Sequence, residues 1–442
     1  IALSLMTVMS AVAGLNMALP KIAVSTDATQ TQLTWIVDSY TVIFAGLLLI
    51  SGAIGDKYGR QRILLAGLSI FAIGASIGYF QSDPNGLIFA RIIMGMGAAA
   101  IMPSTLSVIT TSFPVEERGK AIGVWVGVAG GGAVLGLFGT ALLLEWFDWN
   151  SFFALNLGLA LISILGTLKV PNSRDENVAG LDWIGGVLSI LFVGGIVFGI
   201  IEGPEKGWQS IETISGLLVG GISLVVFVLW ELRQKHPLLD PRLFRNRGFS
   251  AGSLSITIQF FAQFGFIFVG MQYLQFVAGF SPLEAATHLL WMPLVVLPGS
   301  RLAGALSKKI PQKYLGTIGL LLFGYAMFHF AGLPRIFDYW YFTIGILIFG
   351  LGLALSATPA TVAITSALPE SKQGVASAVN DTAREVGSAL GIAILGALLT
   401  DSYKSEMSKV TDGLPVVIAE KLEKGIAFTQ IDPPAQLKAC LL

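Results

Sequence analysis

The feature that most constrains this chain is a succession of apolar segments, each long enough to cross a lipid bilayer. A membrane-spanning helix needs roughly 20 mostly apolar residues. Thirteen segments of the 442-residue sequence meet this requirement. They are 1–20, 33–54, 62–80, 86–110, 119–143, 150–169, 182–202, 210–231, 250–276, 283–306, 314–332, 339–363 and 374–399. The sequence therefore predicts an all-α polytopic membrane protein.

The composition excludes several classes of function. Charged residues make up only 12% of the chain, and its net charge is zero. A soluble domain carries roughly twice that charged fraction, and a chain without net positive charge has no bulk attraction for nucleic acid. The single cysteine, Cys440, allows no disulfide within the chain and no thiolate metal site. The sequence has no GxxxxGK[ST] loop and no His/Cys cluster, so we expect no enzyme, no cofactor and no metal.

Lysine and arginine gather in alternate loops, which predicts the orientation of the chain. The loops after even-numbered segments hold sixteen of them, whereas those after odd-numbered segments, before the tail, hold only Lys21, Lys206 and Arg335. Positive loops stay in the cytoplasm. We therefore expect a cytoplasmic N-terminus and an external loop at 401–438 with a short amphipathic helix. Because both ends of the sequence lie in apolar stretches, we also expect a trimmed chain in which a fourteenth span starts at the C-terminal end.

Two stretches, beginning at Pro103 and at Pro359, are copies of an internal repeat. The copies differ where Val126, Ala129 and Gly130 correspond to three charged residues of the second copy. The matched pairs, all at an offset of 255, are Pro114 and Pro369, Gly119 and Gly374, Ala121 and Ala376, Gly132 and Gly387, and Gly136 and Gly391.

An offset of 255 is longer than six spans need, so we infer that two helices are inserted between two repeated bundles. The predicted domains are an N-terminal six-helix bundle at 1–170, two inserted transmembrane helices at 182–232, a cytoplasmic linker at 233–249 and a C-terminal bundle at 250–442.

The loop between the second and third segments reads GDKYGRQR. Its glycines permit a tight turn with close approach of helices. Its acid can cap the next helix or pair with a basic group on a neighbouring helix end. We expect a conformational latch that breaks during each cycle, formed by Gly55, Asp56, Gly59 and Arg60. A simple positive anchor with an incidental turn is the alternative.

The chain resembles the major facilitator superfamily, and within it the fourteen-span drug:proton antiporter branch that includes the quaternary-ammonium exporters. The resemblance rests on GDKYGRQR, on LIFARIIMGMGAA, on WIVDSYTVIFAGLLLISGAIGD, on LLDPRLFRNRGF and on GVASAVNDTAREVGSALG. It covers essentially the whole chain. It implies two six-helix bundles with a substrate path between them, and proton-driven export of amphipathic compounds.

Two departures from that branch stand out. The branch often has an acid in span 1, about five residues before an Asn that matches Asn16, and this chain has Ala11 there. The antiporter motif of span 5, usually GPxxGG, is replaced by GLFGTA at 136–141. Both departures weaken the case for export of divalent cations.

Charged residues inside the predicted spans are the candidates for proton coupling, because charges in a bilayer are costly and mark function. Asp38 lies near the outer end of the second segment, where withdrawal from water favours a carboxyl group that takes up and releases protons. Arg91 should face the interior and hold a carboxylate or backbone carbonyls. An acid wetted by headgroups and a purely structural ion pair are the respective alternatives.

The second copy of the repeat carries a further charged cluster. Asp381, Arg384 and Glu385 have spacings of i, i+3 and i+4 and therefore share one helix face. They form either a proton-titratable group or a salt-bridged cluster that fixes the cytoplasmic gate.

A substrate cavity with aromatic walls and a few uncharged polar groups suits amphipathic molecules. Glutamines that only bond between helices are the alternative. The residues that we expect to line this cavity are Asn16, Trp35, Tyr40, Gln259, Phe260, Gln263, Gln272, Tyr273, Phe276 and Trp291.

The expected function is proton-coupled efflux of amphipathic, chiefly cationic drugs across a bacterial-type cytoplasmic membrane. Export of an endogenous lipid, siderophore or metabolite remains an alternative, as does a non-transporting sensor or scaffold. The expected partners are the substrate, protons and membrane lipids, and we expect a functional monomer.

Overall fold

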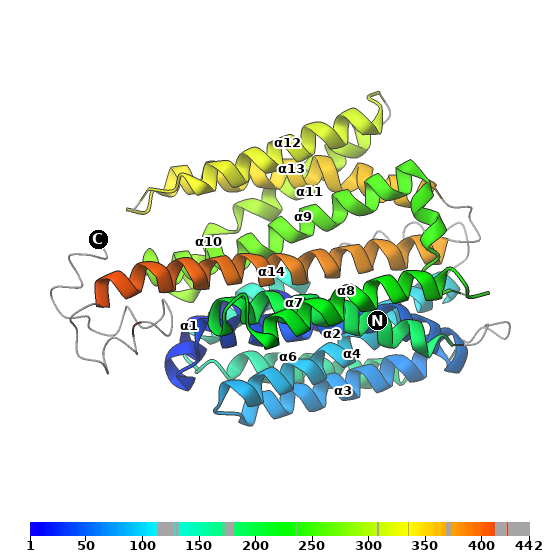
Figure 1. Ribbon diagram of the computed structural model, residues 1–442, viewed down its shortest axis with the longest axis horizontal. Helices are drawn as coiled ribbons and strands as arrows, with labels where there is room; N and C mark the ends of the chain where they lie inside the picture. Colours follow the sequence, from blue (N-terminus) through cyan, green and yellow to red (C-terminus); the bar gives the residue numbers. More distant parts are fainter. Residues whose placement is uncertain are drawn as a thin grey trace.

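The computed structural model is a bundle of long helices that run roughly alongside one another (Figure 1). It describes residues 1–112, 128, 132–170, 172, 181–235, 237–306, 309–334, 336–367, 373–411 and 422. Within these ranges, ten helices are long and apolar enough to cross a membrane. The chain is thus an all-α, multi-pass membrane protein, and the predicted fold class is confirmed.

The helices follow the predicted segments. The first half contains α1 (Ala2–Thr26), α2 (Gln30–Tyr58), α3 (Arg60–Phe80), α4 (Pro84–Ser112), a helix at Gly132–Leu143, and α6 (Ser151–Thr167). The inserted pair is α7 (Trp183–Lys206) and α8 (Ile211–Glu231). The second half contains η1 (Pro241–Arg245), α9 (Arg247–Gln272), the π-helical turn η2 (Tyr273–Val277), α10 (Pro282–His288), α11 (Trp291–Leu306), α12 (Gln312–Ala331), α13 (Tyr339–Ser366) and α14 (Gln373–Thr411).

The prediction of one continuous span at 283–306 was wrong. A short helix, α10, ends at His288, and α11 begins anew at Trp291. Ser281 and Glu284 form a capping box that starts α10. Pro293 then falls in the first turn of α11, where a missing backbone N–H leaves no hydrogen bond unmade. Hydropathy could not show this break, because both pieces are apolar.

The predicted external loop begins too early. Helix α14 continues to Thr411, so residues 401–411 are helical. The polar residues of this extension stand mostly exposed, and Lys409 pairs with Glu406 at 2.7 Å. Hydropathy marks where a span leaves the apolar layer, not where its helix ends. The amphipathic helix expected further along the tail lies, except for Leu422, outside the described residues.

The internal repeat has a direct counterpart in how the helices pack. A side chain at Gly132 or Gly136 would collide with the backbone of α1 at Met6 and Ser10. A side chain at Gly387 or Gly391 would likewise collide with the backbone of α9. The contact residues on α9 are Thr257 and Phe261. In each half the matched glycines therefore let two helices approach closely at equivalent places.

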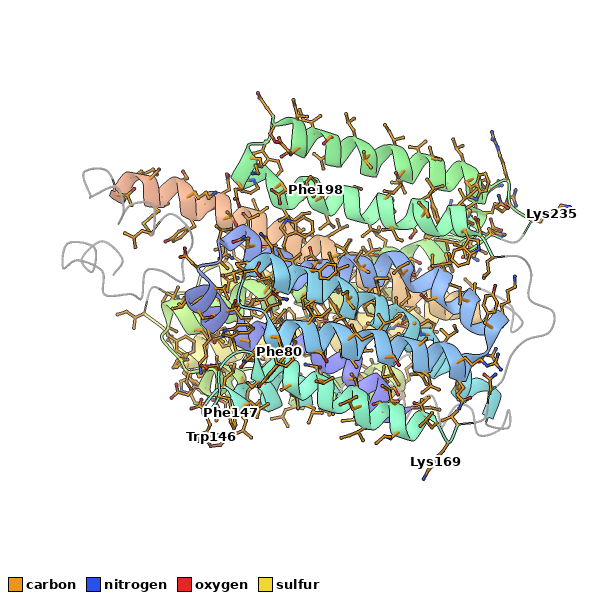
Figure 2. All side chains as sticks on the ribbon, turned by 90° about the horizontal axis from the view of Figure 1, so that it is seen from below. Phe80, Trp146, Phe147, Lys169, Phe198 and Lys235 are labelled. Atoms are coloured by element: carbon orange, nitrogen blue, oxygen red, sulfur yellow. The ribbon has the colours of Figure 1, made fainter. Side chains whose placement is uncertain are left out.

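The two ends of the bundle differ in charge. Lys169 and Lys235 lie at one end, and Phe80, Trp146 and Phe147 lie at the other (Figure 2). We call the end that carries the loops after α2, α6 and α8 the basic end, and the other the opposite end.

The inserted helices α7 and α8 lie along one side of the bundle (Figure 2). Helix α7 packs against α2 of the first half and against α14 of the second. Its contacts to α2 are close: a Cβ on Gly46 would lie 3.0 Å from Ile190. The inserted pair therefore sits beside the junction between the halves. The predicted domain boundaries remain a prediction.

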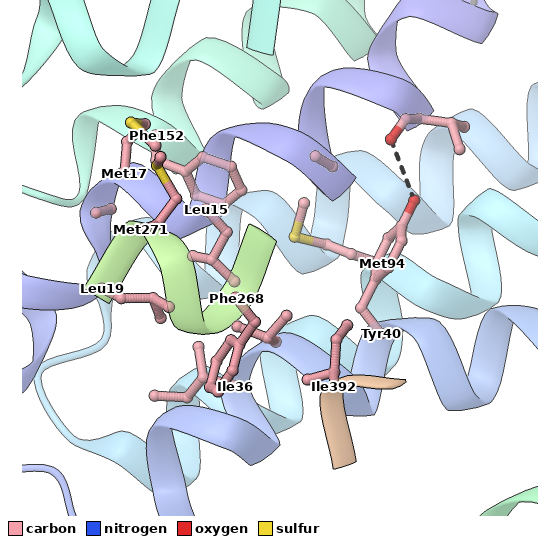
Figure 3. Packing of buried hydrophobic residues seen from close by; sticks show 14 of the residues in the cluster. Leu15, Met17, Leu19, Ile36, Tyr40, Met94, Phe152, Phe268, Met271 and Ile392 are labelled. Carbon is pink, nitrogen blue, oxygen red and sulfur yellow. Dashed lines mark hydrogen bonds between the residues drawn. The ribbon is translucent and has the colours of Figure 1, made fainter. Parts of the chain in front are cut away.

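The halves are joined at the opposite end by a shared core. Phe268 and Met271 of α9 belong to the same buried cluster as Leu15 and Leu19 of α1, and Figure 3 shows them side by side. Towards the basic end of α9, Phe260 and Phe264 are only half-buried. The path between the halves is therefore closed at the opposite end.

Candidate functional site

Asp38 occupies the middle of the third turn of α2 and is fully buried. Both of its carboxylate oxygens lack a hydrogen-bond partner among the described residues. The alternative of an acid wetted by lipid headgroups does not fit a side chain with no exposed surface. A buried carboxylate without a partner is costly in free energy, so the surrounding structure favours Asp38 with a bound proton.

The face of α2 that carries Asp38 looks toward α14. One turn before it, Thr34 lies against Gly396, where an added Cβ would be 3.0 Å from Thr34 Oγ1. One turn after it, Val42 belongs to a cluster with Ala389 and Ala393 of α14. Residues four apart share a helix face. Asp38 therefore lies at the boundary between the two halves.

Arg91 of α4 is buried but does not hold Asp38. Its Nε donates to the carbonyl of Ile36 at 3.1 Å, and its Nη1 donates to that of Ala11 at 3.3 Å. Its guanidinium also lies 4.1 Å from the centre of the Tyr40 ring. Arg91 thus ties α1, α2 and α4 together. It reaches the backbone of the very position at which the related exporters often carry an acid.

The three charges of α14 lie on the same side of that helix, as their spacing predicts. Arg384 Nη1 lies 3.9 Å from Asp381 Oδ1. The amide oxygen of Asn380 accepts from Nε and Nη2 of Arg384, both at 3.3 Å. The guanidinium lies 5.3 Å from the ring centre of Phe260 on α9. Arg384 therefore interacts with one acid, and Glu385 remains half-buried beside it.

Glu385 lies on the α14 face that meets α2, because Ala389 is one turn further along. Asp38 faces α14 near Ala393, about eight residues from Glu385, which is roughly 12 Å along a helix. The structure thus brings Asp38, Tyr40 with Arg91, and the α14 cluster to one junction, although the acids do not touch.

The predicted latch is a tight turn. Gly59 has φ of +109°, ends α2 and starts α3. A Cβ there would also meet the side chain of Asn172 at 2.5 Å. The contacts of the Asp56 side chain lie outside the described residues. Gly55 faces Ser104 of α4, and Arg60 is half-buried.

Two aromatic residues assigned to the cavity have other partners. The indole Nε1 of Trp35 donates to Glu202 Oε1 of α7 at 2.7 Å, and its ring lies 5.9 Å from that of Phe198. Tyr40 is buried beneath Arg91 and donates to the carbonyl of Val8, the dashed line in Figure 3. In this conformation the ring of Tyr40 is fully buried, and that of Trp35 is half-buried against α7.

Several predicted cavity residues close the opposite end instead. Gln272 Oε1 accepts from Gln30 Nε2 at 3.0 Å, which links α9 to α2. Gln275 Nε2 donates to the carbonyl of Asn16 at 3.4 Å, which links η2 to α1. Phe276 is buried in the shared core. Trp291 lies at this end too, where its Nε1 donates to Tyr339 Oη at 3.0 Å.

The remaining predicted cavity residues carry unused polar groups. Gln259 is fully buried, and neither of its amide atoms has a hydrogen-bond partner within the described ranges. Gln263 Oε1 and Tyr273 Oη are also without partners. The rings of Phe260 and Phe264 are stacked, with their centres 5.8 Å apart. Aromatic rings beside unpaired polar atoms suit a molecule that has both apolar and polar parts.

Sequence reasoning missed the partners of Gln272 and of Trp35. Gln30 and Glu202 were not considered, although each is a polar residue within or beside an apolar segment. A polar residue in such a position indicates a contact with another polar group, because polar side chains in a membrane need a partner.

The sequence matches the model of one protein family, described as the major facilitator superfamily, over residues 1–392. The multidrug resistance protein Stp of Mycobacterium tuberculosis (strain CDC 1551 / Oshkosh) is 32% identical over 87% of this chain and 72% of its own length. The methyl viologen resistance protein SmvA of Salmonella typhimurium (strain 14028s / SGSC 2262) is 31% identical over 97% of this chain and 87% of its own.

The fold also matches solved structures. A bacterial homologue of the human lysosomal transporter Spinster, in an inward-facing and unoccupied conformation, has a TM-score of 0.62 at 16% identity. The match covers 96% of this chain and 91% of that one. At this identity the likeness concerns the fold alone.

Proposed function

The chain belongs to the major facilitator superfamily, and from that premise we propose that it exports amphipathic, chiefly cationic drugs in exchange for protons by alternating access. The names of its relatives, which refer to resistance to several drugs and to methyl viologen, support export of drugs. Transporters of this superfamily are not enzymes, and the chain follows that pattern.

Asp38 is the observation that carries the proposal of proton coupling. It is an acid with no exposed surface and with no hydrogen-bond partner among the residues that the structure describes, at the junction where the halves must separate. A proton removes the cost of burying the charge. When the halves part at this level and water enters, the proton can leave. Binding and release of a proton are therefore tied to the movement itself.

The α14 cluster supplies the second part of the mechanism. Arg384 neutralises Asp381, whereas Glu385 has no basic partner within salt-bridge distance among the described residues. A cationic substrate that approached Glu385 would be attracted, and a proton bound there would expel it. One negative group then serves proton and drug in turn, which produces exchange.

The direction of opening follows from the loops. Positive loops face the cytoplasm, so we place the basic end there, together with the N-terminus. We propose that the path, closed at the opposite end, opens towards the cytoplasm, where a drug to be exported is collected. We place the protein in a bacterial-type cytoplasmic membrane, as a monomer that needs no cofactor besides the proton gradient.

The test is transport in proteoliposomes with an imposed pH gradient. Wild-type protein should accumulate a labelled cationic amphiphile against its gradient. Asp38→Asn and Asp381→Asn should each lose the accumulation driven by the gradient. Glu212→Gln, an exposed acid at the far end of α8, should behave like the wild type. Equal rates for both variants and the wild type under the gradient would refute proton coupling through these acids.

A second candidate is export of a neutral endogenous lipid, siderophore or metabolite. Gln259 favours it, because a buried amide with two unpaired atoms suits a neutral hydrogen-bonding group. A panel of cationic and neutral amphiphiles, compared by their thermal stabilisation of the protein, separates the two candidates. A sensor or scaffold without transport predicts no counterflow of any compound.

A further inference from the structure

A second buried acid lies away from the site around Asp38. Glu231 is the last residue of α8, at the basic end, and has no exposed surface. Its Oε1 has no hydrogen-bond partner in the part of the chain that the structure describes. Neither its helix nor its position belongs to the site around Asp38.

Asp182 lies next to Glu231. Asp182 caps α7 by accepting from the backbone N–H of Gly185 at 2.8 Å. It also accepts from the indole of Trp230, 3.0 Å from each of its oxygens. A Cβ on Gly185 would lie 2.5 Å from Glu231 Oε1 and 2.8 Å from Asp182 Oδ2. The two carboxylate oxygens are therefore no more than about 5.3 Å apart, the sum of those distances.

The linker to the second half folds back over this acidic pair. The backbone N–H of Leu239 donates to Glu231 Oε2 at 3.4 Å. Arg242 Nη2 donates to the carbonyl of Leu232 at 2.9 Å, and Asp240 caps the following turn. The linker thus separates Glu231 from water, and it leads directly into α9.

We propose that Glu231 and Asp182 form a second proton-binding site, and that the proton bound there holds the linker against the end of α7 and α8. Two ionised carboxylates this close repel each other, and burial of one of them adds a cost in free energy that a single shared proton removes. When the proton leaves, Glu231 can regain water only if the linker lifts away.

The groups around the pair are consistent with this role. Asp240, on the linker, adds a further negative charge near Glu231, and the Nη2 of Arg242 is already bonded to a carbonyl. The site lies at the end assigned to the cytoplasm. It therefore makes the attachment between the inserted helices and the second half depend on the cytoplasmic pH, whatever the transported compound is.

Hydrogen–deuterium exchange of the linker amides, on the whole protein in lipid nanodiscs between about pH 5 and pH 9, tests the proposal. After correction for intrinsic exchange, wild-type protection at 237–246 should fall by up to about tenfold per pH unit above the pH at which the proton is lost. Glu231→Gln should keep the linker protected at every pH, because its amide oxygen still accepts from Leu239 and cannot ionise.

Three variants complete the design. Asp182→Asn keeps the cap of α7 but removes the negative charge next to Glu231, so it should move the loss of protection to lower pH. His236→Asn tests the histidine that comes five positions after Glu231 in the sequence, and Glu212→Gln tests an exposed acid on α8; both should retain the wild-type pH profile.

Several results would overturn the proposal. They are a wild-type profile that does not change with pH, a Glu231→Gln profile that follows the wild type, an Asp182→Asn midpoint equal to that of the wild type, or protection that depends on sodium at constant pH. None of these readouts depends on transport, so failure here is distinguishable from failure of the proposed export.

Discussion

Replacement of Gln30 by leucine should loosen the closure at the opposite end. The change removes the 3.0 Å hydrogen bond from Gln30 Nε2 to Gln272 Oε1, one of the bonds that join the halves. Hydrogen bonds between helices in membranes contribute about 0.6 kcal/mol on average and up to about 1.7. The buried amide of Gln272 would then have neither atom paired, since its Nε2 already lacks a partner. We therefore expect a cost of about 1 kcal/mol to the closed state.

A cost of about 1 kcal/mol changes a two-state equilibrium roughly fivefold. The assay is alkylation of a cysteine at position 34 by a membrane-impermeant reagent, in a background that carries Cys440→Ser. Thr34 is buried against Gly396 of the other half, so it reacts only when the halves part. Gln30→Leu should raise the alkylation rate about fivefold over the same background.

The double variant Gln30→Leu/Gln272→Leu is the control. Replacing both partners with apolar groups leaves no orphaned amide and is nearly neutral, so its rate should return towards that of the background. If Gln30→Leu alone leaves the rate within about twofold of the background, the bond does not hold the opposite end closed and the reasoning fails.

Two further predictions concern packing. Gly391→Val should clearly lower the thermal unfolding temperature, because the valine side chain would collide with the backbone of Phe261. Overpacking of this kind costs about 1–3 kcal/mol of stability. Gly166→Ala is the control: no described atom lies within 4 Å of the added Cβ, so its unfolding temperature should stay close to that of the wild type. Arg91→Lys should destabilise the protein by about 1–3 kcal/mol, because one ammonium cannot reproduce both carbonyl bonds and the stacking on Tyr40; thermal stability equal to that of the wild type would contradict this role.

The helices themselves were predictable for two reasons. A helix needs about 20 apolar residues to cross the bilayer, and its backbone polar groups must form hydrogen bonds within the helix because lipid offers none. The matched glycines 132 and 387, and 136 and 391, also had a readable meaning, since close packing in lipid needs small residues. Their partners, Met6 and Thr257 for the first pair, could not be read from the sequence. No local sequence pattern in α1 or α9 distinguishes the residues that pack against these glycines.

The candidate site was predictable in its members and not in its contacts. Asp38 and Arg91 stood out as charges inside spans, and the structure buries both. The sequence did not indicate which groups these two side chains contact. Arg91 donates its hydrogen bonds to backbone carbonyls of α1 and α2, and Asp38 has no hydrogen-bond partner among the described residues. The bond between Gln30 and Gln272 joins residues 242 positions apart. Such a contact depends on how the two halves meet, which no local pattern specifies.

The central claim is that drug and protons move in opposite directions through one junction, and direct detection of proton movement tests it. Proteoliposomes with a trapped pH-sensitive dye, no imposed gradient and a clamped membrane potential are loaded on one side with a cationic amphiphile. The account predicts a pH change that depends on the amphiphile in the wild type and disappears in Asp38→Asn. Transport of the amphiphile without any proton movement in the wild type would contradict it.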